Sequence, residues 1–205
     1  MLIKICGLRE ADHALLTAEL GADLLGFVFA DSPRQIAPES AREIIARLPS
    51  AVGKVGVFVD CDLGVINDII SFCGLDFAQL HGKETPEYCL AVQAPVIKAW
   101  RIKDEESLTE LLPYRDCVEM FLLDTYVKGA VGGTGQTFDW SLAGQAAEYG
   151  KIILAGGLTP ENVALAVETV GPYGVDVSSG VETAGAKDMA KIAAFIKQAR
   201  GRKYA

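Results

Sequence analysis

The chain has 205 residues, of which half are hydrophobic and 22% are charged, and its formal net charge is -8. This length suits one large domain, and the apolar fraction is sufficient for a substantial buried core. An acidic chain repels the phosphate backbone of nucleic acids, so we expect no nucleic-acid partner. No stretch approaches the roughly 20 consecutive apolar residues of a membrane span, so we expect no membrane partner either.

The N-terminal segment and the cysteines indicate the compartment. Residues 1–5 are followed at once by a polar, glycine-containing stretch, which does not resemble the apolar region of a signal peptide. The five cysteines are odd in number and lack the close pairs of a zinc or redox motif. We therefore predict a cytoplasmic protein with free thiols.

Short aliphatic runs alternate along the chain with segments of helical periodicity. The predicted strands are Leu2–Ile5, Leu24–Phe29, Lys54–Val59, Phe77–Leu80, Val96–Trp100, Met120–Leu123, Lys151–Ala155 and Gly174–Ser178. The clearest helical segments are Ala11–Leu20, Glu39–Leu48, Leu63–Phe72 and Lys187–Ala199. Several strands are continuously hydrophobic, as is typical of strands covered on both faces.

Eight strand–helix units account for the whole length, and strict alternation implies a parallel sheet with right-handed crossovers. We therefore predict the α/β class and a (βα)8 TIM barrel that occupies residues 1–205 as a single domain. The fifth unit is the weakest, because residues 101–113 are heavily charged. The alternative is an open doubly wound sheet, which usually carries a glycine-rich turn after its first strand. The first strand here leads into CGLR at residues 6–9, which is no such turn.

The loops after the seventh and eighth predicted strands are candidates for phosphate binding, because phosphate commonly binds at these loops of a (βα)8 barrel. The seventh strand leads into AGGLTPEN at 155–162, where Thr159 and Pro160 are predicted to begin a helix. The eighth leads into Ser178–Gly180. Either loop alone could be an ordinary turn. Together they predict an anion site made of backbone N–H groups.

Cys6 ends the first predicted strand and Asp124 ends the sixth. A small buried apolar residue is the ordinary alternative for Cys6, and a helix cap is the alternative for Asp124. Catalysis would require a neighbouring cation or a helix N-terminus to ionise the thiol, and burial or negative charge to keep the carboxyl protonated. Strands one and six are three steps apart around a closed barrel, about 12 Å, so the two side chains can flank a small substrate.

Three further features lie near the predicted strand ends. Arg34 stands on a proline-stiffened loop, where it can either bind a carboxylate in a bidentate pair or remain solvated. His81 follows the fourth strand and is either catalytic or, more often for a loop histidine, only hydrogen-bonded. The glycine-rich segment Lys128–Gln136 is predicted to be a lid over the end of the sixth strand.

Nine ordered segments of the chain resemble the phosphoribosylanthranilate isomerase family. They are KICGL at 4–8, GADLLGFVF at 21–29, SPRQI at 32–36, VGVFV at 55–59, QLHG at 79–82, LLDT at 122–125, GGTGQTFDW at 132–140, AGGLTPENV at 155–163 and GVDVSSGVE at 174–182. Any one of them would be weak support. Nine in this order, spread over the whole chain, are specific.

The resemblance implies a (βα)8 barrel that converts N-(5-phosphoribosyl)anthranilate into 1-(2-carboxyphenylamino)-1-deoxyribulose 5-phosphate. This is an Amadori rearrangement in tryptophan biosynthesis that needs no metal or cofactor. The resemblance also implies that Cys6 is the general base, that Asp124 is the general acid, and that Arg34 binds the anthranilate carboxylate. The other substrate-binding residues it implies are Gly156, Gly157, Asp176, Ser178, Ser179 and Gly180. It leaves open whether the protein is a monomer or a homodimer.

The implied mechanism needs a protonated acid beside an ionised base, so the pKa values of Asp124 and Cys6 are expected to be displaced from their ordinary order. Two residues depart from the family pattern. Gln35 follows Arg34 where an aromatic residue is expected, and Trp100 is bulkier than expected and could narrow the mouth of the barrel. We expect both departures to affect affinity rather than the type of reaction.

Two other functions are compatible with the same barrel. A sugar-phosphate isomerase or epimerase would usually place metal-binding histidines or paired aspartates at the mouth, and the chain has only two histidines. A catalytically silent sensor of a phosphorylated ligand would keep the loops around Gly157 and Ser179 but could lose Cys6 or Asp124. Both residues are present, which favours the isomerase.

Overall fold

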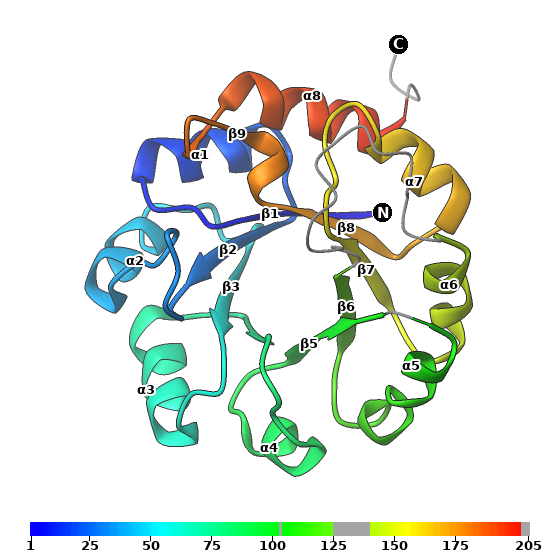
Figure 1. Cartoon of the computed structure of the whole chain (residues 1–205). Coiled ribbons are helices and arrows are strands. Elements are labelled where there is room, and N and C mark those ends of the chain that lie inside the picture. Colours follow the sequence, from blue (N-terminus) through cyan, green and yellow to red (C-terminus); the bar gives the residue numbers. More distant parts are fainter. Residues whose placement is uncertain (103, 125–139, 202–205) are drawn as a thin grey trace.

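Eight parallel strands form a closed barrel surrounded by helices in the computed structural model, which describes residues 1–102, 104–124 and 140–201 (Figure 1). The strands are β1 (Leu2–Cys6), β2 (Leu24–Val28), β3 (Gly53–Phe58), β4 (Phe77–Leu80), β5 (Val96–Arg101), β6 (Met120–Asp124), β7 (Ile152–Ala155) and β8 (Gly174–Val177). Each pairs with its sequence neighbour, and β1 pairs with β8 to close the ring. The predicted (βα)8 barrel is therefore confirmed.

The helices follow the strands in turn. They are α1 (Ala11–Glu19), α2 (Pro38–Ile45), α3 (Leu63–Cys73), α4 (Pro86–Ala91), α5 (Glu106–Thr109), α6 (Trp140–Gln145), α7 (Val163–Val170) and α8 (Met189–Arg200). The fifth helix has only four residues and belongs to the unit that was weakest in the sequence. A short antiparallel pair, β9 (Glu182–Thr183) and β10 (Ala186–Lys187), separates β8 from α8.

The barrel wall separates two apolar cores, because successive side chains of a strand point to opposite faces. On β1, Ile3 and Ile5 belong to the core between the sheet and the helices. The barrel interior is filled by a second cluster that includes Val55, Ile97 and Ile153. Leu2, Lys4 and Cys6 therefore point into the barrel. This packing closes the N-terminal end and leaves the C-terminal end as the place for a site.

The start of α7 differs from the prediction. The helix begins at Val163, with Asn162 at the N-cap, and not at Thr159 and Pro160. Asn162 explains the difference, since its Oδ1 accepts a hydrogen bond from Thr159 N at 2.8 Å while its Nδ2 donates to Gly157 O at 3.0 Å. These two hydrogen bonds within the loop after β7 hold its conformation up to the residue where the helix begins.

Candidate active site

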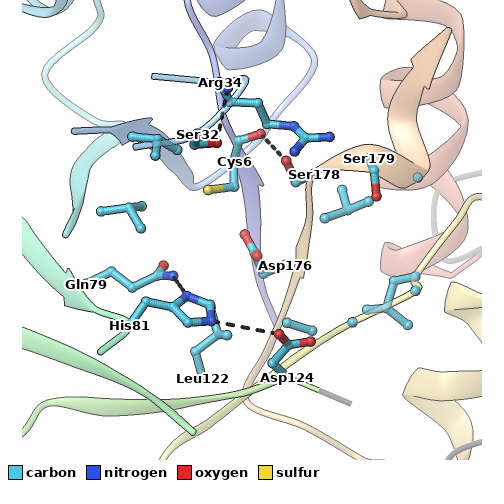
Figure 2. A pocket seen from close by; sticks show the side chains of 18 residues that line it. Cys6, Ser32, Arg34, Gln79, His81, Leu122, Asp124, Asp176, Ser178 and Ser179 are labelled. Carbon is cyan, nitrogen blue, oxygen red and sulfur yellow. Dashed lines mark hydrogen bonds and ion pairs between the residues drawn. The ribbon is translucent and has the colours of Figure 1, made fainter. Parts of the chain in front are cut away.

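A cavity of about 320 Å³ opens at the C-terminal ends of the strands (Figure 2). Its lining includes all nine residues that the family resemblance gives as catalytic or substrate-binding: Cys6, Arg34, Asp124, Gly156, Gly157, Asp176, Ser178, Ser179 and Gly180. They come from β1, β6, β8 and the loops after β2, β7 and β8. Because the carboxyl ends of parallel strands meet at one end of a barrel, residues far apart in sequence converge here.

Gly7 makes room for Arg34 at the end of β1. Its φ of +80° lies in the left-handed region, and a Cβ at this position would lie 2.6 Å from Cδ of Arg34. The neighbouring Ser178 hydroxyl donates a hydrogen bond to Cys6 O at 3.1 Å, which joins the ends of β1 and β8. Glycine at position 7 therefore lets Arg34 lie across the strand end beside Cys6.

Arg34 is held by a carboxylate that the sequence analysis did not single out. Its Nε and Nη2 donate to the two carboxylate oxygens of Glu182, both at 2.7 Å, and Lys187 Nζ lies 2.8 Å from Glu182 Oε1. Although burial raises the pKa of Glu182, the hydrogen bonds from Arg34 and Lys187 lower it to about 2. A substrate carboxylate would bind Arg34 by displacing Glu182 or through guanidinium hydrogens that Glu182 does not use.

Glu182→Gln should lower the free energy of unfolding at neutral pH by about 1–3 kcal/mol, because it removes the charge shared by Arg34 and Lys187. The folded-state pKa of Glu182, about 2, lies below the unfolded value of 4.5, so its stabilisation is complete above pH 4.5 and is lost as pH falls toward 2. Urea unfolding of both proteins between pH 8 and about 2 measures this.

The matched control for that experiment is Glu119→Gln, which removes an exposed ion pair with Lys151. An exposed pair contributes about 0–1 kcal/mol, so the free energy of unfolding of this variant should stay close to that of the unmodified protein at every pH. If the difference in free energy of unfolding between Glu182→Gln and the unmodified protein stayed constant as pH approaches 2, the assigned pKa of Glu182 would be contradicted.

The loops after β7 and β8 touch each other where an anion is expected. Gly156 and Gly157 have φ of +84° and +65°, in the left-handed region. A Cβ on Gly180 would lie only 1.9 Å from Leu158 O, so no larger residue fits there without moving the backbone. Such close approach of glycine-rich backbone leaves N–H groups near the cavity, the arrangement that suits a phosphate.

The opposite wall of the cavity carries Asp124, His81 and Gln79 (Figure 2). His81 Nε2 lies 3.8 Å from Asp124 Oδ2, and Gln79 Nε2 lies 3.1 Å from His81 Nδ1. With the Gln79 amide in this orientation, Nδ1 accepts and Nε2 carries the proton toward Asp124. His81, whose role the sequence left open, therefore lines the cavity beside the predicted acid.

Gln79 was missed by the sequence analysis as a site residue, although it belongs to the QLHG segment. It is 2% exposed, and its Oε1 has no hydrogen-bond partner among the described residues. A buried polar atom without a partner is rare in folded proteins. Its place in the cavity wall makes Gln79 a further candidate for contact with a ligand hydroxyl.

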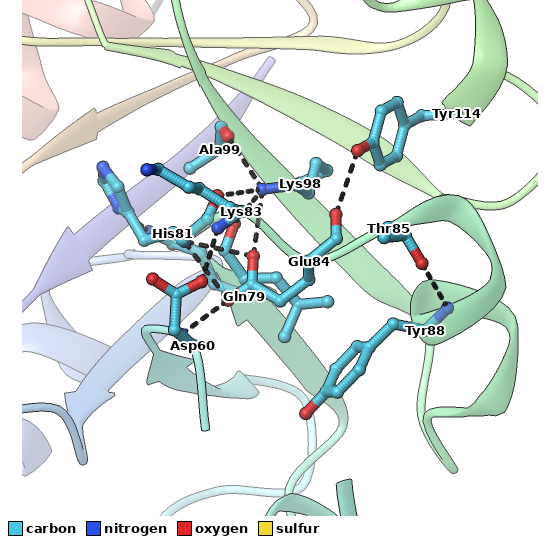
Figure 3. Close-up of polar contacts among 12 residues, drawn as sticks. Asp60, Gln79, His81, Lys83, Glu84, Thr85, Tyr88, Lys98, Ala99 and Tyr114 are labelled. Atoms are coloured by element: carbon cyan, nitrogen blue, oxygen red, sulfur yellow. Dashed lines mark hydrogen bonds and ion pairs between the residues drawn. The ribbon is translucent and has the colours of Figure 1, made fainter. Parts of the chain in front are cut away.

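The loop that carries His81 is fastened from behind by a buried ion pair (Figure 3). Lys98 is fully buried on β5, and its Nζ lies 3.0 Å from Glu84 Oε2 and donates to Gly82 O at 2.8 Å. Glu84 also accepts hydrogen bonds from the backbone N–H groups of Asp60 and Gly82. These bonds satisfy both buried charges and connect the loops after β3 and β4.

Cys6 is 8% exposed and shares its face of β1 with a second buried lysine, two residues earlier. Lys4 is fully buried and its Nζ lies 2.8 Å from Asp176 Oδ1. Burial raises the pKa of the Cys6 thiol, Lys4 and Lys187 lower it, and Asp176 raises it, with a net upward displacement. In the protein without substrate, burial therefore outweighs the two lysines and disfavours ionisation of the thiol.

The family model described as N-(5′-phosphoribosyl)anthranilate (PRA) isomerase matches residues 3–198. The chain belongs to the PRA isomerase family. The enzyme of that name from Moorella thermoacetica is 54% identical over 199 residues, with 97% of this chain and 89% of the relative covered. The Geobacter sulfurreducens enzyme is 53% identical, with 97% of this chain and 98% of the relative covered.

Solved structures of PRA isomerases agree with this assignment. The crystal structure from Thermotoga maritima is 43% identical, with a TM-score of 0.90 and 98% of each chain covered. Another PRA isomerase structure, a complex with reduced 1-(o-carboxyphenylamino)-1-deoxyribulose 5-phosphate, is 41% identical, with a TM-score of 0.87 and 98% of each chain covered. The family resemblance found in the sequence is therefore confirmed, while the roles of the individual residues remain predictions.

The two departures from the PRA isomerase pattern are not among the residues that line the main cavity. Gln35 Nε2 donates to Phe29 O at 3.1 Å. Trp100 packs against Tyr114 with ring centroids 5.1 Å apart and lines an adjoining hollow of about 540 Å³, which shares His81 and Asp124 with the main cavity. Trp100 therefore borders the far side of the acid and not the Cys6 side. The predicted lid, Lys128–Gln136, lies outside the described residues.

The described part of the chain lacks the features of two other classes of protein. No cluster of three or more His, Cys, Asp or Glu side chains with metal-site geometry occurs in residues 1–102, 104–124 and 140–201. Within the same ranges, no helix has the length and apolar character needed to cross a membrane.

Proposed function

We infer that this chain isomerises N-(5′-phosphoribosyl)anthranilate in tryptophan biosynthesis, with Cys6 as general base and Asp124 as general acid. The observation that carries the assignment of roles is that one cavity is lined by Cys6, by Asp124 and by the glycine-rich loops after β7 and β8. These three parts of the wall match the parts of a phosphorylated sugar that must be deprotonated, protonated and anchored.

Asp124 is proposed to start the reaction. Its carboxyl proton passes to the ring oxygen of the ribose, the bond from that oxygen to C1 breaks, and the anthranilate nitrogen lone pair forms a C=N bond. The open-chain product is a protonated Schiff base. The donor must lie on the ring-oxygen side of the sugar, and His81 beside Asp124 can stabilise the carboxylate that remains.

Cys6 is proposed to complete the rearrangement. Its thiolate takes the proton from C2, and the electron pair of that C–H bond forms a C1–C2 double bond and neutralises the iminium nitrogen. The resulting enolamine becomes a ketone at C2 as the C2 hydroxyl loses its proton and C1 gains one. Carbon 1 is reduced and carbon 2 is oxidised within one molecule, so the step needs no external oxidant or reductant.

The remaining lining residues are proposed to bind the two anionic ends of the substrate. Gly156, Gly157, Ser178, Ser179 and Gly180 would hold the phosphate through backbone N–H groups, and Arg34 would bind the anthranilate carboxylate. Asp176 lines the same cavity and is proposed to lie near the sugar. Anchoring at both ends fixes C2 in place for proton transfer.

The expected compartment is the cytoplasm, and the expected assembly is a monomer or a homodimer. All five cysteines are free thiols in the structure, which suits a reducing compartment. One of the related Thermotoga maritima structures is of monomers made from a dimeric enzyme. Sedimentation of the purified protein over a range of concentrations would decide its assembly.

The direct test of the activity is fluorescence. The substrate should be generated freshly from anthranilate and phosphoribosyl pyrophosphate by a coupling enzyme, because it is unstable, and its loss should be followed after addition of the purified protein. First-order loss in proportion to protein concentration is expected. A rate equal to spontaneous decay would refute the proposed function.

Arg34→Ala should raise KM about 10–100-fold with a smaller change in kcat, because a bidentate charge-assisted pair contributes roughly 1.5–3 kcal/mol. Arg9→Ala is the matched control, since Arg9 is exposed and donates to Pro33 O in the same region, at 2.8 Å. Steady-state kinetics of the three proteins measures the effect. Unchanged KM and kcat in Arg34→Ala would remove Arg34 from substrate binding.

A further inference from the structure

Lys4 and Lys98 are both fully buried and both form an ion pair at short distance, yet they lie on opposite faces of the barrel wall. Lys98 lies among backbone carbonyls and the carboxylate of Glu84. Lys4 points into the barrel, where its ammonium donates to Asp176 Oδ1 at 2.8 Å, and Cys6 lies two residues further along on the same face of β1. Burying an ammonium is costly unless it has charged or polar partners, so the partners of Lys4 are informative.

The position of Lys4 next to Cys6 follows from strand geometry. Residues two apart on a strand point to the same face, so Lys4 lies directly below Cys6 inside the barrel. The parallel register pairs Lys4 with Asp176 on β8, which holds the ammonium from the side. Cys6 therefore has a fixed cation beneath it that is fully shielded from solvent.

The charges around Cys6 come from several elements. They are Lys4 on β1, Asp176 on β8, Arg34 on the loop after β2, Glu182 on β9 and Lys187 on β10, with His81 and Asp124 on the opposite wall. On the Cys6 side this makes three cations against two carboxylates among the described side chains. One further negative charge makes the group neutral, and a Cys6 thiolate would supply it.

Arg34 and Lys187 are less suited than Lys4 to be the partner of that thiolate. Both are engaged with Glu182, and Arg34 is the residue proposed to bind the substrate carboxylate. Burial is the main cause that lowers the pKa of Lys187, whereas Asp176 and Cys6 overcome burial and raise the pKa of Lys4. Lys4 thus remains charged where a thiolate would need it.

We propose that Lys4 is a positioning residue for the isomerase reaction: its buried ammonium, held by Asp176, is the counter-ion of the Cys6 thiolate. The inference rests on the proposed role of Cys6 as base. It explains how a thiol buried at the end of β1 ionises at all, since a nearby opposite charge offsets the cost of burying the sulfur anion. Lys4 acts through Cys6 and need not touch the substrate.

Titration of the thiol in the substrate-free protein tests this without relying on turnover. Thiolate absorbance should be recorded against pH for each protein and for its counterpart that also carries Cys6→Ser, so that the difference reports Cys6 alone. Lys4→Gln should raise the Cys6 pKa by about 1–3 pH units. Lys98→Gln, which removes an equally buried and paired lysine on the other face, should leave it unchanged.

Equal displacement of the Cys6 pKa in both lysine variants, or none in either, would overturn the proposal. The unmodified protein offers a second measurement in case Lys4→Gln fails to fold. In protein with isotope-labelled lysine, the Lys4 side-chain resonance should shift as Cys6 titrates, and this shift should vanish in Cys6→Ser. A Lys4 resonance that does not shift during the titration of Cys6 would also overturn the proposal.

Kinetics separate this inference from the proposed function. The alkaline-rising limb of the kcat profile should move to higher pH in Lys4→Gln and stay in place in Lys98→Gln. If Cys6→Ser kept full turnover, Cys6 would not be the base, which is a failure of the proposed function. The thiol titration would still decide whether Lys4 and Cys6 are electrostatically paired.

Discussion

Cys6→Ser should lower kcat about a hundred- to ten-thousand-fold, the usual contribution of a positioned general base. A serine hydroxyl is a much weaker acid than a thiol, so Lys4 could not keep it ionised near neutral pH. The side chain is nearly the same size, so the cavity and the phosphate loops should be preserved. KM should change far less than kcat, because the anionic ends of the substrate bind elsewhere.

Two measurements accompany this variant. Steady-state fluorescence gives kcat and KM, and calorimetric titration with a reduced product analogue reports whether binding survives. Cys117→Ser is the matched control, because Cys117 is a half-buried cysteine outside the cavity lining and should keep full turnover. A Cys6→Ser enzyme with undiminished kcat would remove Cys6 from the mechanism.

Asp124→Asn should reduce kcat over the same range, about a hundred- to ten-thousand-fold, for the complementary reason. The amide matches the carboxyl in shape but has no acidic proton to give to the ring oxygen, so ring opening would depend on water. His81 remains beside position 124 in this variant, and we expect that it does not take over as the proton donor. Binding of the product analogue should again be preserved.

Asp116→Asn is the control for that substitution, since Asp116 is exposed on the segment that leads into β6. A substrate analogue whose sugar is already in the open-chain form offers a sharper comparison. Asp124→Asn should process it nearly as fast as the unmodified enzyme, while Cys6→Ser should not. Equal impairment of Asp124→Asn on closed and open substrates would contradict a role confined to ring opening.

The strands were predicted to within one residue at each end, because each is a run of aliphatic side chains bounded by polar or glycine-containing loops. The same regularity explains why all nine predicted site residues line one cavity. Once eight alternating units imply a closed barrel, every residue just after a strand must lie at the same end. The fifth helix and the start of α7 were harder to predict from the sequence. Each depends on local contacts: α5 is very short, and the side chain of Asn162 holds the loop before α7.

His81 and Gln79 show a limit of reading strand ends from sequence. Both were visible in the QLHG segment, yet nothing in the pattern indicates that Gln79 Nε2 meets His81 Nδ1 or that His81 faces Asp124. Glu182 was quoted only as part of a family segment. Its bidentate bond to Arg34 joins residues 148 positions apart, and no periodicity encodes such a pairing.

The sequence by itself determined which residues stand at the ends of strands, because strand periodicity and turn chemistry are local properties of the chain. Only the tertiary structure decided the electrostatics of the site. Lys4 meets Asp176 across 172 positions because β1 closes on β8, and the pKa of Cys6 is raised because the folded barrel buries it. Burial and charge pairing are properties of the whole packed molecule, and they set the ionisation on which a proton-transfer mechanism depends.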